Sequence, residues 1–567
     1  MANYGFIIDN RKCIGCHACT VACKAEHDVP VGVNRTWVKY IEKGTFPQTT
    51  RLFSVLRCNH CDDAPCVEIC PVTALFRRPD GIVDFDNRRC IGCRACMQAC
   101  PYDALYIDPH TRTAAKCNYC AHRIDRGLEP ACVNVCPTHA IISGDLDDPN
   151  SEISRLKNEQ RVTVRKPEKG TLPALYYIEG DVASLDPGAA PAAHEGMWNN
   201  QTRGVGHYAH FLQTRFGEHS EQTERGNGAL AAPRQPQHDH PVRLIDTLEK
   251  FLSLGSDQTG VLDRASGNPE STAGRHVAAE VARRTYDAPR KGVLWGWQVP
   301  AYMWTKSLSA GAVLLPLVAA LTGWAQPSLG LQAIGVIVGI VFLGLTGAFL
   351  AGDLDQPKRF IYVLLRPQWR SWLVRGAYLI TGYGIALAIW LVWGLGSGVA
   401  PPAWYSALLV LFAAGTAMYT ALLFAQAKAR DFWQSPLLGV HMLLHAILAG
   451  GAFYLLFAFL FRDPSFHWQP YLSAVVLGTL LAKLTCDWLE LGTTHATADA
   501  ARTAHAITRG RYRKLYWGGV VVAGTLVPLV FVQASPWLWP PAGLLILAGI
   551  YLAEHIWVRA PQDLPLA

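Results

Sequence analysis

Apolar residues are distributed unevenly along this chain of 567 residues. The first 290 residues contain no apolar run of membrane-spanning length, whereas such runs recur from about residue 299 onward. A helix needs about 20 consecutive, predominantly apolar residues to cross about 30 Å of hydrocarbon. Eight spans are predicted, at residues 299–321, 331–350, 372–393, 404–424, 437–460, 471–491, 517–532 and 538–558. The seventh is short and contains Pro528, but eight runs in succession indicate a transmembrane bundle rather than a soluble one.

The chain is too long for one ordinary domain, and its composition indicates three parts. Residues 1–180 hold nearly all of the cysteines, and residues 291–567 hold the apolar spans. Residues 181–290 are rich in Gly, Pro, His and small polar residues, which is typical of a linker. We expect this middle segment to lie along a partner subunit.

The positions of the cysteines along the chain constrain its chemistry more than those of any other residue type. Sixteen of the 17 cysteines lie between Cys13 and Cys136. A secreted disulfide scaffold would need an export signal, and the opening MANYGFIIDNRKC has neither the apolar core nor the twin-arginine address of one. Because disulfides rarely persist in the cytosol, we expect these cysteines to be reduced and to bind metal. Cys486 stands apart and is interpreted as a small buried apolar residue.

The sixteen cysteines form four groups of four. The groups are Cys13, Cys16, Cys19 and Cys23; Cys58, Cys61, Cys66 and Cys70; Cys90, Cys93, Cys96 and Cys100; and Cys117, Cys120, Cys132 and Cys136. The first and third share the spacing C-x2-C-x2-C-x3-C, while the other two contain longer gaps. Three closely spaced thiolates can bind three corners of one cubane, and the fourth cysteine then ligates the other cluster of a pair.

Zinc is the usual alternative for cysteines in C-x2-C pairs. Zinc sites need only two such pairs, and the tighter run does not suit a single tetrahedral ion. Pro71, Pro101 and Pro137 each follow a fourth cysteine directly, as in the bacterial ferredoxin run. Cys23 is followed by Lys24 instead, which leaves the ligand count intact. The spacing therefore predicts four 4Fe–4S clusters.

With these sixteen cysteines in this order, residues 1–180 resemble the four-cluster ferredoxin-type subunits of membrane-bound molybdoenzymes, such as polysulfide and DMSO reductases. The resemblance implies that the first group pairs with the fourth and the second with the third. The four implied ligand sets are Cys13, Cys16, Cys19 and Cys136; Cys117, Cys120, Cys132 and Cys23; Cys58, Cys61, Cys66 and Cys100; and Cys90, Cys93, Cys96 and Cys70.

Lysine and arginine placement predicts the orientation of the spans. The loops on the N-terminal side of the membrane carry most of these residues, whereas the opposite loops carry only Arg462. The N-terminal-side residues are Arg290, Lys291, Lys358, Arg359, Arg366, Arg370, Arg375, Lys428, Arg430, Arg502, Arg509, Arg511, Arg513, Lys514 and Arg559. Because cytoplasmic loops carry an excess of Lys and Arg, the iron–sulfur domain is predicted to face the cytoplasm from the inner membrane.

The spans resemble the membrane subunit of the polysulfide reductase family. The matching pieces are YMWTKSLSAGA in the first span, DLDQPKRF after the second and YTALLFAQAKARDFW at the end of the fourth. The resemblance implies a bundle that binds a quinone and carries no haem. Many relatives face the periplasm with an exported catalytic subunit, and the charge pattern here predicts the reverse.

Ionisable residues inside a membrane are costly, so they are candidate functional residues. The candidates are Lys306, Asp353, Asp355, His441, His445, Lys483, Asp487, Glu490, Glu554 and His555, and almost all are predicted in the cytoplasmic half. Lys483 and Asp487 are four residues apart, so an ion pair and a proton relay both remain open. Haem ligation by His441 and His445, which share a face, would require a histidine on another helix. Tyr419 is the candidate for contacting a quinone carbonyl, with an ordinary interior tyrosine as the alternative.

Together these patterns predict an α+β ferredoxin-like region of tandem 4Fe–4S modules followed by an all-α bundle of eight transmembrane helices. The favoured function is electron transfer between a cytoplasmic molybdopterin-containing catalytic partner, with molybdenum or tungsten, and menaquinone or ubiquinone in the lipid bilayer. Lys306, Asp353, Tyr419, His441 and His445 are the candidate quinone-site residues.

The chain has no recognisable pterin-binding domain, so substrate chemistry is assigned to the partner. The resemblance together with the cytoplasmic orientation favours oxidation of sulfite or another sulfur compound, and formate, polysulfide, thiosulfate and sulfoxide chemistry remain open. A redox-coupled ion pump or a transmembrane electron conduit without a molybdenum partner is the alternative, and a purely structural anchor is a third possibility. The net charge of +7 is attributed to membrane orientation, because no basic patch with interleaved aromatic residues indicates nucleic acid.

Overall fold

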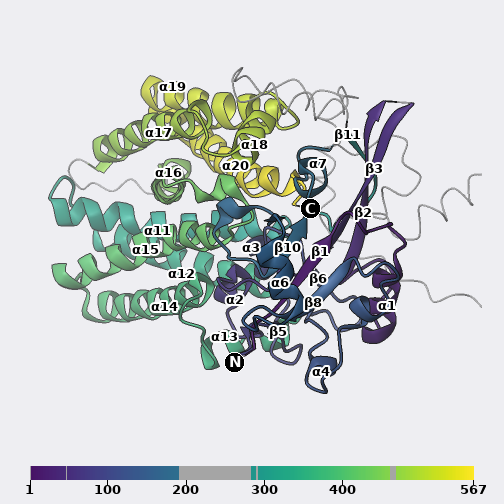
Figure 1. The fold of residues 1–567 in the computed structure, drawn as a ribbon. Coiled ribbons are helices and arrows are strands. Elements are labelled where there is room, and N and C mark those ends of the chain that lie inside the picture. Colours follow the sequence, from purple (N-terminus) through teal and green to yellow (C-terminus); the bar gives the residue numbers. More distant parts are fainter. Residues whose placement is uncertain (1, 46, 191–281, 289–290, 460–467, 567) are drawn as a thin grey trace, which may run out of the picture.

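The computed structural model describes the chain except residues 1, 46, 191–281, 289–290, 460–467 and 567. Most of the predicted 181–290 linker, as well as Arg290 and Arg462, therefore lies outside the described residues. Figure 1 shows a bundle of long helices beside a region of strands and short helices. The expected order, an α+β ferredoxin-like region followed by a helical membrane domain, is confirmed.

Two sheets organise the N-terminal region. The strand order in the larger one is β8-β1-β10-β9, in which the apolar strand β1 (Tyr4–Asp9) runs parallel to β10 (Leu175–Ile178) and antiparallel to β8 (Ile141–Asp145). The second sheet has the order β11-β2-β3, and two short hairpins accompany it. The other described strands are β2 (Thr36–Thr45), β3 (Gln48–Arg57), β4 (Leu75–Arg77), β5 (Val83–Phe85), β6 (Leu105–Ile107), β7 (Ala114–Lys116), β9 (Val162–Thr163) and β11 (Ala282–Tyr286).

Seven short α-helices lie in the described residues of this region, and the first five begin within the cysteine groups. They are α1 (Ala18–His27), α2 (Pro65–Ile69), α3 (Ala95–Ala99), α4 (Ala121–Ile124), α5 (Ala131–Asn134), α6 (Glu152–Glu159) and α7 (Val182–Leu185). The residues that precede α1, α3 and α4 are His17, Arg94 and Cys120, and all three have left-handed backbone angles. This conformation reverses the chain within one residue, which allows thiols before and after the turn to face one cavity.

Both described ends of the 181–290 segment pack on the second sheet. Strand β11 pairs antiparallel with β2, and Arg283 on this strand forms an ion pair with Glu42 on β2 at 2.8 Å. Helix α7 packs against β2 and β3, and its first residue is preceded by Asp181, which forms an ion pair with Lys43 at 2.8 Å. The chain therefore leaves the N-terminal region and returns to it before it enters the bundle.

Eight helical spans in the described residues form the second part of the molecule, as the apolar runs predict. Seven contain the single helices α11 (Gln298–Thr322), α12 (Leu329–Gly352), α14 (Trp372–Ser397), α15 (Ala403–Gln426), α16 (Leu438–Leu456), α17 (Trp468–Gly492) and α20 (Trp539–Arg559). The seventh span in chain order combines a π-helical segment, η5 (Leu515–Leu526), with α19 (Val527–Ala534). Pro528 lies in the first turn of α19, directly after the end of the π-helical segment. The short helices α13 (Tyr362–Leu365) and α18 (Ala498–Thr508) lie between spans.

Glycine allows the closest helix approaches in the bundle. A Cβ atom built on Gly311 of α11 would lie 1.8 Å from the carbonyl oxygen of Ala446 on α16. Gly450 of α16 faces the backbone of Gly311 in the same way, and Gly524 meets Gly549 between η5 and α20. Small residues at such crossings let backbones pack directly, which stabilises helix association in lipid.

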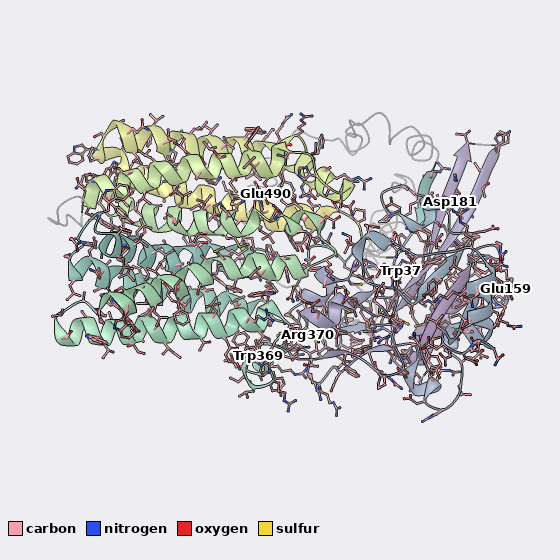
Figure 2. The ribbon with its side chains drawn as sticks, turned by 60° about the vertical axis from the view of Figure 1, so that its left-hand side comes forward. Trp37, Glu159, Asp181, Trp369, Arg370 and Glu490 are labelled. Carbon is pink, nitrogen blue, oxygen red and sulfur yellow. The ribbon has the colours of Figure 1, made fainter. Side chains whose placement is uncertain are left out.

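The N-terminal region caps one end of the bundle, as Figure 2 shows from the side. Arg94, next to Cys93, forms an ion pair at 2.5 Å with Asp355, which follows α12. Gly92 has a φ of +72°, and a Cβ there would lie 2.6 Å from the Asp355 Cβ. Gln98 of α3 is hydrogen-bonded to Gln562 and to Arg430, both from the membrane part. These buried polar contacts fix the third cysteine group against the bundle.

Candidate functional site

The fold brings the sixteen cysteines into four sets of four. Three sets each surround a small cavity. In the fourth set, the thiols lie close enough to interact electrostatically with one another. The cavity-lining sets are Cys13, Cys16, Cys19 and Cys136; Cys58, Cys61, Cys66 and Cys100; and Cys70, Cys90, Cys93 and Cys96. The remaining set is Cys23, Cys117, Cys120 and Cys132. In each set three cysteines come from one sequence group and one from the paired group, as the resemblance implies.

The surroundings of these thiols fit polynuclear iron–sulfur clusters. Burial together with neighbouring thiols raises the pKa of the Cys19 and Cys117 thiols to about 11, against the lowering effect of Arg57, and raises the pKa of Cys120 to about 12. Thiolates gathered in this way need a strongly positive partner, which iron supplies. Among the described residues, no three His, Cys, Asp or Glu side chains are arranged to hold a single metal ion. Four cysteines that line one cavity, as in three of the sets, provide the four thiolate ligands of a cubane. That each set holds one cluster stays a prediction.

The set formed by Cys70, Cys90, Cys93 and Cys96, here called the membrane-side set, lies against the bundle. The Trp295 indole donates a hydrogen bond to the Cys93 carbonyl at 3.2 Å, and Arg359 donates to the Cys90 carbonyl at 2.9 Å. The ring of Trp295 stacks on Phe424 and on Trp433, with centroid distances of 5.6 and 5.5 Å. An apolar aromatic layer therefore joins this set to α15 and to the segment before α16.

Lys306 and Tyr419, two of the predicted quinone-site residues, are brought together in the bundle. The buried Lys306 amine donates to the Thr420 hydroxyl at 2.6 Å and to the Ala417 carbonyl at 3.0 Å. It also lies over the Tyr419 ring, 4.7 Å from the centroid. Since α11 and α15 supply these residues, the pairing depends on helix packing. Thr420 is not among the predicted residues, although it follows Tyr419 in the YTALLFAQAKARDFW piece that carries the resemblance.

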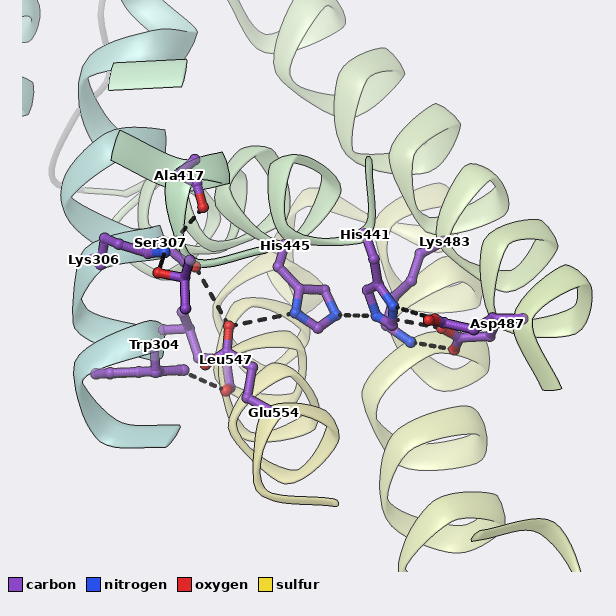
Figure 3. Close-up of polar contacts among 12 residues, drawn as sticks. Trp304, Lys306, Ser307, Ala417, His441, His445, Lys483, Asp487, Leu547 and Glu554 are labelled. Carbon is purple, nitrogen blue, oxygen red and sulfur yellow. Dashed lines mark hydrogen bonds and ion pairs between the residues drawn. The ribbon is translucent and has the colours of Figure 1, made fainter. Parts of the chain in front are cut away.

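His441 and His445 occupy a different place, in a series of polar contacts that crosses four helices (Figure 3). Their Nε2 atoms are 3.0 Å apart, and the Nδ1 of His441 lies 3.0 Å from Glu490 of α17. The Nδ1 of His445 lies 3.4 Å from Glu554 of α20. Ser307 of α11 donates to the same Glu554 oxygen at 3.4 Å. Because Ser307 is the neighbour of Lys306 along α11, Glu554 lies between the histidine pair and the helix that carries the lysine.

Lys483 and Asp487 extend the series at its other end. The Lys483 amine lies 2.6 Å from one Asp487 oxygen, and the second oxygen lies 3.5 Å from His441 Nε2. The Trp557 indole donates to Glu490 at 3.1 Å and its ring packs edge-on against His441. Both interpretations of the Lys483–Asp487 spacing are therefore compatible with the geometry, because the ion pair is one end of the longer series.

Asp353 lies at the junction with the N-terminal region, and Tyr302 of α11 interacts electrostatically with it and with Tyr419 and Glu554. Burial raises the pKa of Asp353 to about 7, with Arg94 opposing and Asp355 supporting the shift. Its electrostatic partners include Cys93 of the membrane-side set. Asp353 therefore lies close to the domain junction, and its place in a quinone site stays a prediction.

The charged side chains in the spans gather toward one end of the bundle. Within the described parts of the eight spans, every Asp, Glu, Lys and Arg lies in the half next to the N-terminal region. With a rise of about 1.5 Å per residue, Lys306 and His445 lie about 10–12 Å along their helices from that end. The described far half consists mainly of apolar side chains.

Comparisons with known proteins match both parts of the chain. Residues 12–75 and 49–146 each match a family model described as a 4Fe-4S dicluster domain, and residues 287–559 match the family model "Polysulphide reductase, NrfD".

Several curated proteins are similar to the N-terminal third. A tetrathionate reductase subunit of Salmonella typhimurium is 46% identical over 188 residues, which cover 32% of this chain and 75% of that protein. A polysulfide reductase component of Wolinella succinogenes is 42% identical over 180 residues, 31% of this chain and 93% of that protein. The thiosulfate reductase electron transfer subunit PhsB of Salmonella typhi is 43% identical over 176 residues, 30% of this chain and 91% of that protein.

Proposed function

The protein belongs to the family of iron–sulfur electron-transfer subunits that includes the tetrathionate reductase subunit of Salmonella typhimurium, and it continues into an NrfD-type membrane domain; we propose that it carries electrons between a cytoplasmic molybdenum or tungsten catalytic subunit and quinone in the inner membrane. The observation that carries the proposal is the contact between Trp295 and Cys93. This hydrogen bond joins the membrane-side set directly to the half of the bundle that holds Lys306, Tyr419 and the histidine pair.

The four cysteine sets provide a path for electrons through the N-terminal region. When bound, 4Fe–4S clusters supply one-electron carriers. Each sequence group contributes cysteines to two sets, which keeps neighbouring sets close, so we propose four clusters, one in each set. The cysteine carbonyls of the membrane-side set accept hydrogen bonds from Trp295 and Arg359, which hold that end of the path rigidly on the bundle.

The bundle residues supply what quinone chemistry requires. Reduction of a quinone to a quinol adds two electrons and two protons, and oxidation releases them. Lys306 uses two of its N–H groups on Thr420 and Ala417, so a third is left to donate to a quinone carbonyl. Tyr419, against the Lys306 amine, orients the ring. Glu554 then exchanges protons with the His445–His441 pair, which is continuous with Glu490 and Asp487.

The partner is proposed to dock at the opposite end of the N-terminal region. Cys16 is exposed, and Ile14, Val21 and Val135 around this set are 56%, 65% and 38% exposed. Helix α1, which carries part of this patch, lies on the side of the molecule away from the bundle in Figure 1. An apolar rim around an exposed cluster ligand suits a protein interface that brings a second redox centre close. Since relatives are named for tetrathionate, polysulfide and thiosulfate, we propose a sulfur compound, sulfite among them, as the partner's substrate.

Charge supports a cytoplasmic location for the N-terminal region. The segment between α12 and α14 at its end of the bundle carries Lys358, Arg359, Arg366 and Arg370, and the described loops at the far end carry no Lys or Arg. Cytoplasmic loops hold the excess of these residues. If protons also come from this side, quinone reduction moves no net charge across the membrane.

A redox-coupled ion pump is the second candidate, and the buried series of polar contacts from Asp487 to Glu554 is the observation that favours it. A pump needs ionisable or watered groups across the full thickness of the membrane. The described parts of the far half of the spans have no Asp, Glu, Lys or Arg, which favours one-sided proton exchange.

Purification of the complex from native membranes through a tag on this protein tests the proposal. We expect about 16 irons for each copy, four for each cubane, and near-stoichiometric molybdenum or tungsten. Clusters reduced with dithionite should be reoxidised by a menaquinone or ubiquinone analogue. Iron without either metal would favour the conduit or pump, and clusters that no quinone reoxidises would overturn the quinone site.

A further inference from the structure

Arg57 ends strand β3 and lies between two of the cysteine sets. Its side chain is completely buried, and one guanidinium nitrogen donates to the Cys132 sulfur at 3.0 Å. The guanidinium also lies over the Phe6 ring at 4.6 Å. Its electrostatic partners are Cys132, Cys117 and Cys19. It therefore lies between the set of Cys23, Cys117, Cys120 and Cys132 and the set of Cys13, Cys16, Cys19 and Cys136.

The positive charge of Arg57 has no carboxylate to balance it. Among the described residues it forms no ion pair with Asp or Glu, and its Nε and second terminal nitrogen have no hydrogen-bond partner there. A buried cation without a counter-charge is strongly unfavourable. Since the nearest acceptors are cysteine sulfurs, the anion that compensates Arg57 is the thiolate-ligated cluster itself.

The other sets receive neutral donors on their sulfurs. Cys70 accepts from the Ala74 N–H at 3.2 Å, Cys90 from the Ala114 N–H at 3.4 Å, and Cys136 from the Ala140 N–H at 3.2 Å. The Nε2 atom of His27 lies 3.2 Å from the Cys120 sulfur and that of His60 lies 3.8 Å from the Cys117 sulfur, both in the set that contains Cys132. Among the described hydrogen bonds to cysteine sulfur, Arg57 is the permanently charged donor. Hydrogen bonds from ionised donors are roughly twice as strong as neutral ones.

We infer that Arg57 raises the reduction potential of the cluster held by Cys23, Cys117, Cys120 and Cys132, so that this position holds the electron between partner and quinone. The inference rests on the proposed function. Adding one electron makes a thiolate-ligated cluster more negative, and a buried guanidinium bonded to one of its ligands stabilises that added charge. Arg57 thus acts by setting the reduction potential of this cluster, and it contacts neither quinone nor the partner's substrate.

Redox titration followed by electron paramagnetic resonance tests this on the complete complex. Arg57→Gln removes the charge, Arg57→Lys keeps it without the fork of donors, and Arg165→Gln removes another buried arginine, one that donates to the Leu185 and Leu566 carbonyls. In Arg57→Gln we expect one cluster to become at least tenfold harder to reduce, a shift of about 59 mV for one electron. Arg57→Lys should shift the same cluster less, and Arg165→Gln should shift none.

Unchanged midpoint potentials in an Arg57→Gln complex with its full iron content would overturn the inference. If that variant loses iron, wild-type complex with arginine that carries ¹⁵N only in the guanidinium group gives the second readout. Pulsed resonance of the reduced protein should then show ¹⁵N coupling to one cluster, and its absence would overturn the inference. A wild-type complex without iron–sulfur signals would instead remove the proposed function. If the wild-type complex shows iron–sulfur signals and reduces quinone, but Arg57→Gln leaves every midpoint potential unchanged, only this inference is removed.

Discussion

The Nε2 atoms of His441 and His445 face each other at 3.0 Å inside the bundle. Only one of these two nitrogens can carry the proton between them, because a second proton would leave two donors in contact. Their Nδ1 atoms face carboxylates of Glu490 and Glu554 on two other helices. A carboxylate–His–His–carboxylate sequence can pass a proton only if both rings exchange the nitrogen that is protonated.

Breaking this pair should slow proton exchange with quinone. His445→Gln keeps a polar group at this position, but an amide cannot pass a proton from one end to the other. We expect quinone reduction to slow at least about tenfold, within the usual contribution of acid–base groups. The measurement is the rate of cluster reoxidation by a quinone analogue in H₂O and D₂O. His505→Gln, on α18 outside the spans, is the matched control, and an unaltered rate in His445→Gln would exclude the relay.

Lys306 and Tyr419 should differ in their effect on quinone. Lys306→Met removes the cation that contacts Thr420, so we expect the KM for quinone to rise at least about tenfold. Tyr419→Phe keeps the ring beneath the amine and should have a smaller effect. Steady-state quinone reduction with a chemically reduced complex measures both. Equal KM values in wild type and Lys306→Met would place the quinone elsewhere, and Lys358→Met in an exposed segment is the control.

Trp295 should matter through its contact with Cys93. Trp295→Phe retains a ring that can stack on Phe424 and Trp433 but loses the hydrogen bond, at a cost of about 1 kcal/mol in domain docking. Trp295→Ala also opens a cavity beside the membrane-side set, and about 3–5 kcal/mol is expected for such a loss. Thermal unfolding in detergent and cluster reoxidation by quinone measure the two effects. Equal stability of the two variants would show that stacking of the residue 295 ring on Phe424 and Trp433 does not stabilise the contact between the two domains.

Asp353 should make stability depend on pH. Its pKa is raised to about 7 by burial, so the folded chain holds a proton that the unfolded chain releases near its ordinary value. The associated stabilisation is complete below about pH 4 and is lost as the pH rises through about 7. Thermal unfolding at about pH 5 and about pH 8 should therefore show a decline that Asp353→Asn reduces. An identical decline in the variant would assign the pH dependence to other groups.

Gly311 should tolerate no side chain. Gly311→Ala would put a Cβ 1.8 Å from the Ala446 carbonyl, so α11 and α16 must separate. We expect a loss of about 1–3 kcal/mol, the usual cost of overpacking. The matched control is Gly344→Ala on α12, where a Cβ meets nothing within 4 Å. Melting temperatures of the two variants in the same detergent give the comparison, and equal values would contradict the close crossing.

Local patterns are enough to predict much of this protein. The C-x2-C-x2-C-x3-C runs indicate cluster chemistry because ligand spacing within one turn is a property of the sequence alone. The eight predicted spans lie within a few residues of the observed helices, since backbone groups in lipid must be satisfied within each helix. Local patterns are weaker at the seventh span, where a π-helical segment precedes Pro528.

Residues that act together across helices cannot be paired from the sequence. Lys306 and Tyr419 are separate candidates in the sequence and meet in the structure, whereas Asp353 lies at the domain junction. Glu554 is visible in the sequence only as an ionisable residue near a span end, and the structure makes it the partner of His445. Helical periodicity tells which residues share a face, but not which neighbouring helix that face meets.

The sequence by itself determined the cysteine groups, the number of spans and the charge difference between the two ends of the bundle. These follow from spacing, apolar length and composition, which are local properties. Only the tertiary structure decided that Trp295 joins Cys93 to the bundle, that His441 and His445 connect two carboxylates, and that Arg57 lies beside Cys132. Each of these arrangements joins segments far apart in the sequence, and close packing of side chains selects it.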